Sequence, residues 1–209
     1  MYWNDHHEYE GLHAFLGASQ HYWLGWTDQI LYQRYKNSFA ADAGTVIHDL
    51  ASRCIKRRIK LTKDDINLIK MELMNNSIPF NVIDIDKILN NTINFIDYCI
   101  DNNMSSEIIL FYSKYAFGTT DAISFDGKTL KIADLKTGVI PAKVEQLLIY
   151  AALFCLEYNV DPNNIKTELR IFQSGEVLAW EYSGNDIQYY MDRIVETENK
   201  LQNFIKEND

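Results

Sequence analysis

Hydrophobic and polar residues alternate with helical spacing over the first hundred residues of the chain. This spacing predicts four helices, over residues 19–36, 43–60, 61–76 and 84–100. Ser19 is the expected N-cap of the first helix. Thr62 and Asp65 have nearly the spacing of a capping box, which predicts where the third helix begins.

Strand-like patterns begin near residue 107. Residues 107–117 predict one strand that leads to Gly118, and a hairpin turning at Asp126-Gly127 follows. A long apolar helix over 141–158, with Pro141 in its first turn, separates this hairpin from strands over 167–173 and 176–182. The last predicted element is an amphipathic helix, whose inward positions are Ile187, Met191, Ile194, Leu201 and Ile205.

The Asp126-Gly127 pair is typical of a two-residue type I′ turn, because both residues tolerate positive φ. Such a loop pairs Phe125 with Lys128 and makes Asp121 and Asp134 diagonal neighbours on one face, with Lys136 beside them. Diagonal partners lie roughly 7 Å apart, so two carboxylates there repel each other unless a divalent cation lies between them. The alternative is a solvated sheet face on which these charges have no common role.

Taken together, the elements predict one α/β domain over residues 1–209, with a mixed sheet flanked by helices. Its parts are a helical N-terminal portion (1–40), a core (41–183) with inserted helices (62–100), and a C-terminal helix (184–209).

Composition supports a globular chain of this size, with 209 residues and 47% hydrophobic content. The three cysteines lie far apart, which argues against a disulfide framework and against a zinc or iron–sulfur site. We find neither a signal peptide nor an apolar stretch long enough for a bilayer, so the expected location is the cytoplasm.

The net charge of −9 argues against a protein that coats nucleic acid non-specifically. One basic cluster stands out, however, at residues 53–60. On a helix its four cations form a stripe beside His48, which lies on the border with the apolar face. The stripe is either a phosphate track or a plain solvated face, and a lone helical histidine is often only a packing residue. The cations are Arg53, Lys56, Arg57 and Lys60.

Four short motifs follow one another on the predicted elements: "GTVIH" at 44–48, "GTTD" at 118–121, "DLKTG" at 134–138 and "QLLIY" at 146–150. In this order they resemble the PD-(D/E)XK nuclease superfamily, in particular its RecB-like and phage exonuclease branch. The resemblance covers roughly residues 40–160 and implies a restriction-endonuclease-like αβββαβ core that binds Mg²⁺ or Mn²⁺.

The resemblance also implies roles for individual residues. Asp121, Asp134, His48 and the backbone carbonyl of Leu135 would hold the metal, and Lys136 would orient or activate the attacking water. Gln146 and Tyr150 would support the site or the scissile strand. Glu107 is a further candidate ligand, with a surface residue at a strand start as the alternative. The four cysteines of cluster-binding relatives are absent, so no iron–sulfur cluster is expected.

Further residues are candidates for contacts to DNA. Lys143 shares a helix face with Gln146 and Tyr150 and could meet a phosphate. An N-terminal aromatic group could stack unpaired bases, with packing of the first helix as the alternative. Its members are Tyr22, Trp23, Trp26, Tyr32 and Tyr35.

The sequence therefore predicts a metal-dependent deoxyribonuclease, an exonuclease of phage or bacterial recombination or repair. Its substrate would be DNA, and a single-strand annealing or recombination protein is a candidate partner in the bacterial or phage-infected cell. A structure- or sequence-specific endonuclease and a catalytically inactive nucleic-acid-binding module are the alternatives. Polarity, strand preference and oligomeric state stay open at this stage.

Overall fold

The structure is a computed structural model that describes residues 6–7, 14–75, 84–138 and 140–208. Five strands form one open mixed sheet in the order β1-β2-β3-β4-β5, which is also their order along the chain. The strands are β1 (Ser105–Ser113), β2 (Ala116–Phe125), β3 (Thr129–Lys136), β4 (Lys166–Gln173) and β5 (Glu176–Tyr182). Only β3 and β4 are parallel; α4 (Glu145–Tyr158) connects them.

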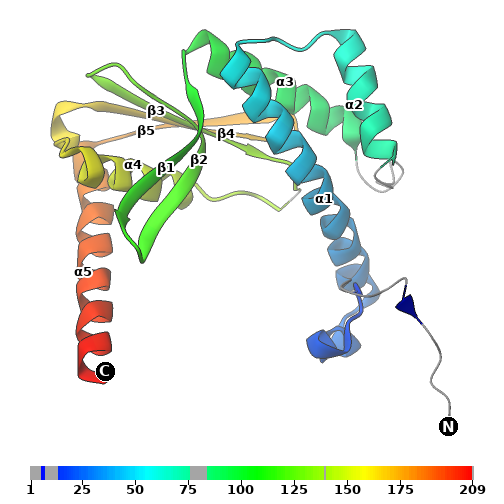
Figure 1. Cartoon of the computed structure of the whole chain (residues 1–209), viewed down its shortest axis with the longest axis horizontal. Coiled ribbons are helices and arrows are strands. Elements are labelled where there is room, and N and C mark those ends of the chain that lie inside the picture. The colour runs from blue at the N-terminus through cyan, green and yellow to red at the C-terminus, as the bar shows by residue number, and fades with distance from the viewer. Residues whose placement is uncertain (1–5, 8–13, 76–83, 139, 209) are drawn as a thin grey trace.

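Helices cover both faces of this sheet (Figure 1). On one face, α1 (Asp28–Arg57) and α3 (Ile85–Asp101) pack with α2 (Lys63–Asn75) against a core that includes Ala133 and Phe172. On the other face, α4 and the first part of α5 (Gly184–Asn208) pack against Ile132, Ile171 and their neighbours. The predicted α/β class with a mixed, helix-flanked sheet is therefore confirmed. Among the described helices, none has both the length and the apolar character needed to cross a membrane.

The N-terminal helices differ from the prediction. In place of helices over 19–36 and 43–60, the chain forms the 3-10 helix η2 (Ala18–Gly25) and one long helix, α1. Thr27, not Ser19, caps α1, and its hydroxyl accepts from the amide of Ile30 at 3.4 Å. Because residues 37–43 contain neither glycine nor proline, nothing interrupts the helix there, and α1 passes through the expected boundary at residue 40.

Further along, several boundaries move. The predicted strand over 107–117 is divided by a turn at Lys114 and Tyr115, so Gly118 lies within β2. Helix α4 begins at Glu145, and Pro141 lies in the loop before it. The predicted capping box of α2 is confirmed, since the Thr62 amide donates to Asp65 at 2.8 Å and the Asp65 amide donates to the Thr62 hydroxyl at 3.3 Å.

Only the first part of the C-terminal helix packs its predicted apolar face against the core. Ile187 is buried, and Met191 and Ile194 pack against the core. Leu201 was predicted to face inward but is 38% exposed, because α5 extends beyond the edge of the sheet (Figure 1).

Candidate active site

The candidate site begins where β2 and β3 separate. Their ladder pairs Phe125 with Leu130 and ends at Ala122 and Ala133, so the next residues, Asp121 and Asp134, stand directly opposite each other. The predicted register, which paired Phe125 with Lys128, is wrong. The Asp126 carboxylate accepts from the amides of Lys128 and Thr129, at 2.9 and 2.7 Å, and this lengthens the loop. Asp126 does not have the positive φ of a type I′ turn.

A third acid extends this pair onto β1. The ladder between β1 and β2 pairs Ser106 with Ala122 and Ile108 with Thr120, so Glu107 stands opposite Asp121. Glu107 has a φ of 54°, and at this residue the side chains of β1 change from one face of the sheet to the other. Ser106 faces α1, whereas Ile108, two residues on, packs on the α4 side, although a regular strand would keep both on one face. Glu107, Asp121 and Asp134 therefore lie in one row across three strands.

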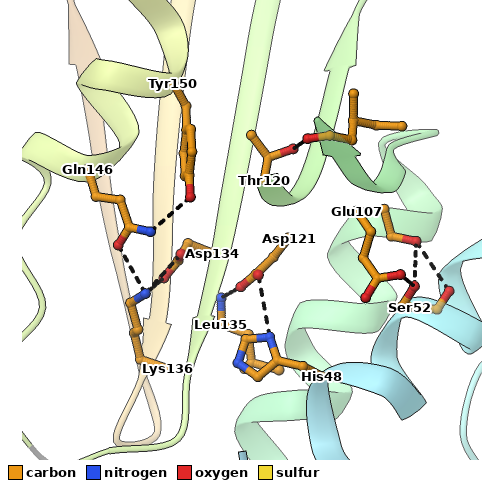
Figure 2. A network of polar contacts seen from close by, with 12 residues as sticks. His48, Ser52, Glu107, Thr120, Asp121, Asp134, Leu135, Lys136, Gln146 and Tyr150 are labelled. Carbon is orange, nitrogen blue, oxygen red and sulfur yellow. Dashed lines mark hydrogen bonds and ion pairs between the residues drawn. The ribbon is translucent and has the colours of Figure 1, made fainter. Parts of the chain in front are cut away.

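Asp121 is held from two directions. Its Oδ2 accepts a hydrogen bond from the Leu135 amide of β3 at 2.8 Å, and its Oδ1 lies 3.4 Å from Nδ1 of His48 on α1 (Figure 2). Burial lowers the pKa of His48, but the hydrogen bond and charge of Asp121 outweigh burial, so the pKa lies above its usual value. The predicted neighbours His48 and Asp121 are thus brought together.

Gly44, one turn before His48, explains how β3 reaches α1. A Cβ atom at Gly44 would lie 2.8 Å from Oγ1 of Thr137, just after β3. Glycine therefore lets the end of β3 approach the helix closely. This contact connects the "GTVIH" and "DLKTG" motifs in space.

Glu107 is fixed by α1 as well. Its Oε2 accepts from the Ser52 hydroxyl at 2.7 Å and from Lys56 Nζ at 2.8 Å. These two hydrogen bonds, that of Lys56 first, lower the pKa of Glu107. His48, Ser52 and Lys56 occupy successive turns of one face of α1, so a single helix face contacts both Asp121 and Glu107.

Lys136 connects the acids to α4. Its Nζ lies 3.0 Å from Oδ1 and 2.9 Å from Oδ2 of Asp134, and it donates to Oε1 of Gln146 at 3.1 Å. Gln146 in turn donates to the Tyr150 hydroxyl at 3.1 Å (Figure 2). The Tyr150 ring packs against Gly118, where an added Cβ would lie 2.8 Å from the ring.

Asp134 has an unfavourable environment when it is ionised. It is only 3% exposed, and burial, followed by the charge of Asp121, raises its pKa to about 6 despite the attraction of Lys136. Its Oδ2 is buried and accepts no hydrogen bond, although it lies within ion-pair distance of Lys136. A divalent cation fits this arrangement, because it would neutralise the repulsion and use the carboxylate oxygens as ligands. Within the described part of the chain, no three metal-ligating side chains are already gathered around one point.

Most predicted phosphate-binding cations have partners within the chain. Arg53 pairs with Asp49 at 3.1 Å, Lys56 with Glu107, and Lys60 with Asp101 at 2.7 Å. Arg57 continues this face of α1, and Lys143 is exposed in the loop before α4. A phosphate on the stripe would therefore compete with carboxylates for three of its four cations.

One supporting residue was not predicted. Gln173, at the end of β4, is buried and stands opposite Lys136 in the parallel ladder. Its amide nitrogen donates to the carbonyls of Gly138 and Ile140, both at 2.7 Å, and its oxygen accepts from the Ala142 amide at 2.8 Å. Gln173 thus anchors the loop from Lys136 to α4. A glutamine directly after the apolar pair Ile171-Phe172 was the signal in the sequence.

Comparison with known proteins yields one match. The model of a family described as "protein of unknown function (DUF2800)" matches residues 13–203, so the chain belongs to this family. The chain has no match among curated proteins and none among solved structures.

Proposed function

We propose that this DUF2800 protein is a metal-dependent deoxyribonuclease with a restriction-endonuclease-like αβββαβ core. The observation that carries the proposal is the row of Glu107, Asp121 and Asp134 across three strands, with Lys136 at its end. A fold without a use for this row would bury the Asp134 carboxylate next to Asp121 at a net cost.

The order of elements supports the same fold. Helix α1 precedes three antiparallel strands, and α4 then leads to β4, which is parallel to β3. In this arrangement the four motifs converge: "GTVIH" on α1, "GTTD" on β2, "DLKTG" on β3 and "QLLIY" on α4.

Asp121, Asp134, His48 and the Leu135 carbonyl would hold Mg²⁺ or Mn²⁺, with Glu107 as a further oxygen ligand. The bound ion would neutralise charge on the scissile phosphate and lower the pKa of a coordinated water. The mixed oxygen and imidazole set suits Mn²⁺ as well as Mg²⁺.

Lys136 has the role nearest to the reaction. Its ammonium group is anchored by Asp134 and by Gln146, so it is oriented before the substrate arrives. A positioned cation stabilises the negative charge that develops in phosphodiester hydrolysis and can orient the attacking water. Tyr150, through Gln146, maintains this position.

The decisive experiment compares end-labelled linear DNA with closed circular DNA, each with and without Mn²⁺. Metal-dependent degradation of linear DNA alone supports an exonuclease, and nicking of the circle supports the endonuclease alternative. Binding without cleavage in Mg²⁺ and Mn²⁺ would support an inactive nucleic-acid-binding module and refute the enzyme. As an independent readout, millimolar Mn²⁺ should raise the melting temperature, and Asp121→Asn should weaken that response.

A further inference from the structure

A cavity of about 550 Å³ lies beside the N-terminal half of α1, outside the candidate active site. Its lining comes from α1 and from the loop that follows β3: Gln29, Ile30, Gln33, Arg34, Asn37 and Ile140. This volume is within the usual range for small-molecule sites. The N-terminal half of α1 projects beyond the sheet (Figure 1).

The lining suits the shape and chemistry of a nucleobase. Gln29, Gln33 and Asn37 recur every four residues and present amide donors and acceptors on one helix face; Gln33 donates to Asn37 at 3.3 Å. Ile30 and Ile140 add apolar walls and are 42% and 64% exposed. Amides recognise the polar edge of a base, whereas apolar side chains contact its flat face.

Arg34 adds a cation suited to a phosphate. Its guanidinium lies 4.8 Å from the ring centre of Trp26 and 5.9 Å from that of Tyr22. No carboxylate of the described residues lies within ion-pair distance of it, in contrast to Arg53, Lys56 and Lys60. An arginine held on aromatic rings, without an acidic partner, is typical of surfaces that bind single-stranded nucleic acid.

The cavity and the candidate active site lie along the same side of α1. Gln33 and Asn37 share a face of α1 with Gly44 and His48, and Asn37 precedes His48 by eleven residues, or about 16 Å of helix. That distance corresponds to about five steps of a stacked strand at about 3.4 Å each. Ile140, on the opposite wall, lies in the loop that Gln173 anchors next to Lys136. One DNA strand could therefore occupy both places.

We propose that this cavity binds an unpaired nucleotide of the DNA strand, with Gln33 and Asn37 on the base edge and Arg34 on the phosphate. The proposal rests on the proposed nuclease function, which requires that the bound strand run from the cavity to the candidate active site. An unpaired nucleotide is favoured over duplex because Ile30 and Ile140 would contact the faces of the base, which stacking covers in a duplex.

The test is a double variant, Gln33→Ala with Arg34→Ala, against a matched control on α5, Asn203→Ala with Lys206→Ala. The control removes the same kinds of exposed side chain far from the cavity. Binding of a fluorescent single-stranded 12-mer and of a blunt duplex is measured by anisotropy, with Ca²⁺ in place of Mg²⁺. We expect affinity for the single strand to fall about 10-fold, as loss of one charged contact and an amide predicts. The salt slope should fall by about 0.7, because one phosphate contact is lost.

Several results would overturn the inference. These are a wild-type protein that does not bind the single strand, an equal loss in the control, or a change below about twofold in the double variant. An equal loss for the duplex would refute the unpaired nucleotide.

Cleavage measured on the same preparations separates the two proposals. If wild type cleaves DNA and the double variant binds like wild type, the cavity proposal fails alone. If wild type cleaves nothing but the double variant loses single-strand binding, the nuclease proposal fails alone.

Discussion

The two halves of helix α1 differ in what they contact. In the C-terminal half, Ala43, Ile47, Ala51 and Ile55 are fully or almost fully buried against the sheet and α3. In the N-terminal half, Ile30, Tyr32 and Tyr35 are 42%, 61% and 42% exposed. One continuous helix therefore serves as scaffold at one end and as a projecting surface at the other.

This difference explains how the helix can serve two purposes. The packed half holds His48 and Ser52 against Asp121 and Glu107, where small displacements would disturb the site. The projecting half is supported by aromatic contacts such as Tyr35 with Phe39, with ring centres 4.7 Å apart, which order it without burying it. Helix formation needs only local hydrogen bonds, whereas rigidity needs tertiary packing.

The sharpest contrast is between chemistry at the packed end and binding at the projecting end. Lys136→Ala should lower turnover by about 10²-fold or more, because a preorganised charge is lost. DNA affinity in Ca²⁺ should change far less, which is the reverse of the Gln33 and Arg34 double variant. Lys128→Ala, in the hairpin loop before β3, is the control for loss of a lysine. A cleavage rate near that of wild type in Lys136→Ala would remove the lysine from the reaction.

The stabilities of two variants test whether the two halves of α1 differ in packing. Ile47 is fully buried, so Ile47→Ala should cost about 2–5 kcal/mol in the free energy of unfolding. Ile30 is 42% exposed, and Ile30→Ala should cost below about 1 kcal/mol. Urea denaturation of both variants measures the difference. Similar losses would mean that the projecting half is packed against something in solution.

The pH dependence of stability tests Asp134. Its pKa is raised from 3.8 to about 6, so its contribution to stability is present below pH 4 and is lost as pH rises through about 6. Asp134→Asn cannot ionise and should gain stability relative to metal-free wild type as pH rises from 4 to 7, by about 3 kcal/mol at pH 7. Melting curves across this range, recorded with a chelator, provide the measurement. Parallel curves for the two proteins would show that Asp134 has an ordinary pKa.

The smallest expected effect concerns the contact between α1 and β3. Alanine in place of a helical glycine normally stabilises by about 1 kcal/mol. At Gly44 the added Cβ would lie 2.8 Å from Thr137 Oγ1, so this gain should be absent, and cleavage should fall about 3- to 10-fold as the end of β3 shifts. Gly25→Ala, in η2, is the control, since nothing lies within 4 Å of its added Cβ. Equal activity in the two variants would refute the contact.

The strand and helix order could be predicted from the sequence, because it depends on local periodicity and turn residues. The capping box at Thr62 and the strands on either side of Ser174-Gly175 are confirmed. The meeting of His48 with Asp121, and of Lys136 with Gln146, was also expected from their motifs and is present. The length of α1 was not predicted, since helices over 19–36 and 43–60 were expected where one helix runs from Asp28 to Arg57.

One local turn contact and several contacts between distant segments decided the rest. Asp126 lengthened the hairpin loop by accepting backbone amides, which moved Asp121 from a diagonal position to one opposite Asp134. The irregular backbone of β1 at Glu107 placed a third acid in the row. Glu107 is held there by hydrogen bonds from Ser52 and Lys56, on a helix about fifty residues earlier. The sequence by itself determined which residues carry charge and which elements they occupy, since both follow from neighbours along the chain. Only the tertiary structure decided which charges meet, because strand irregularity and ion pairing depend on contacts between distant segments.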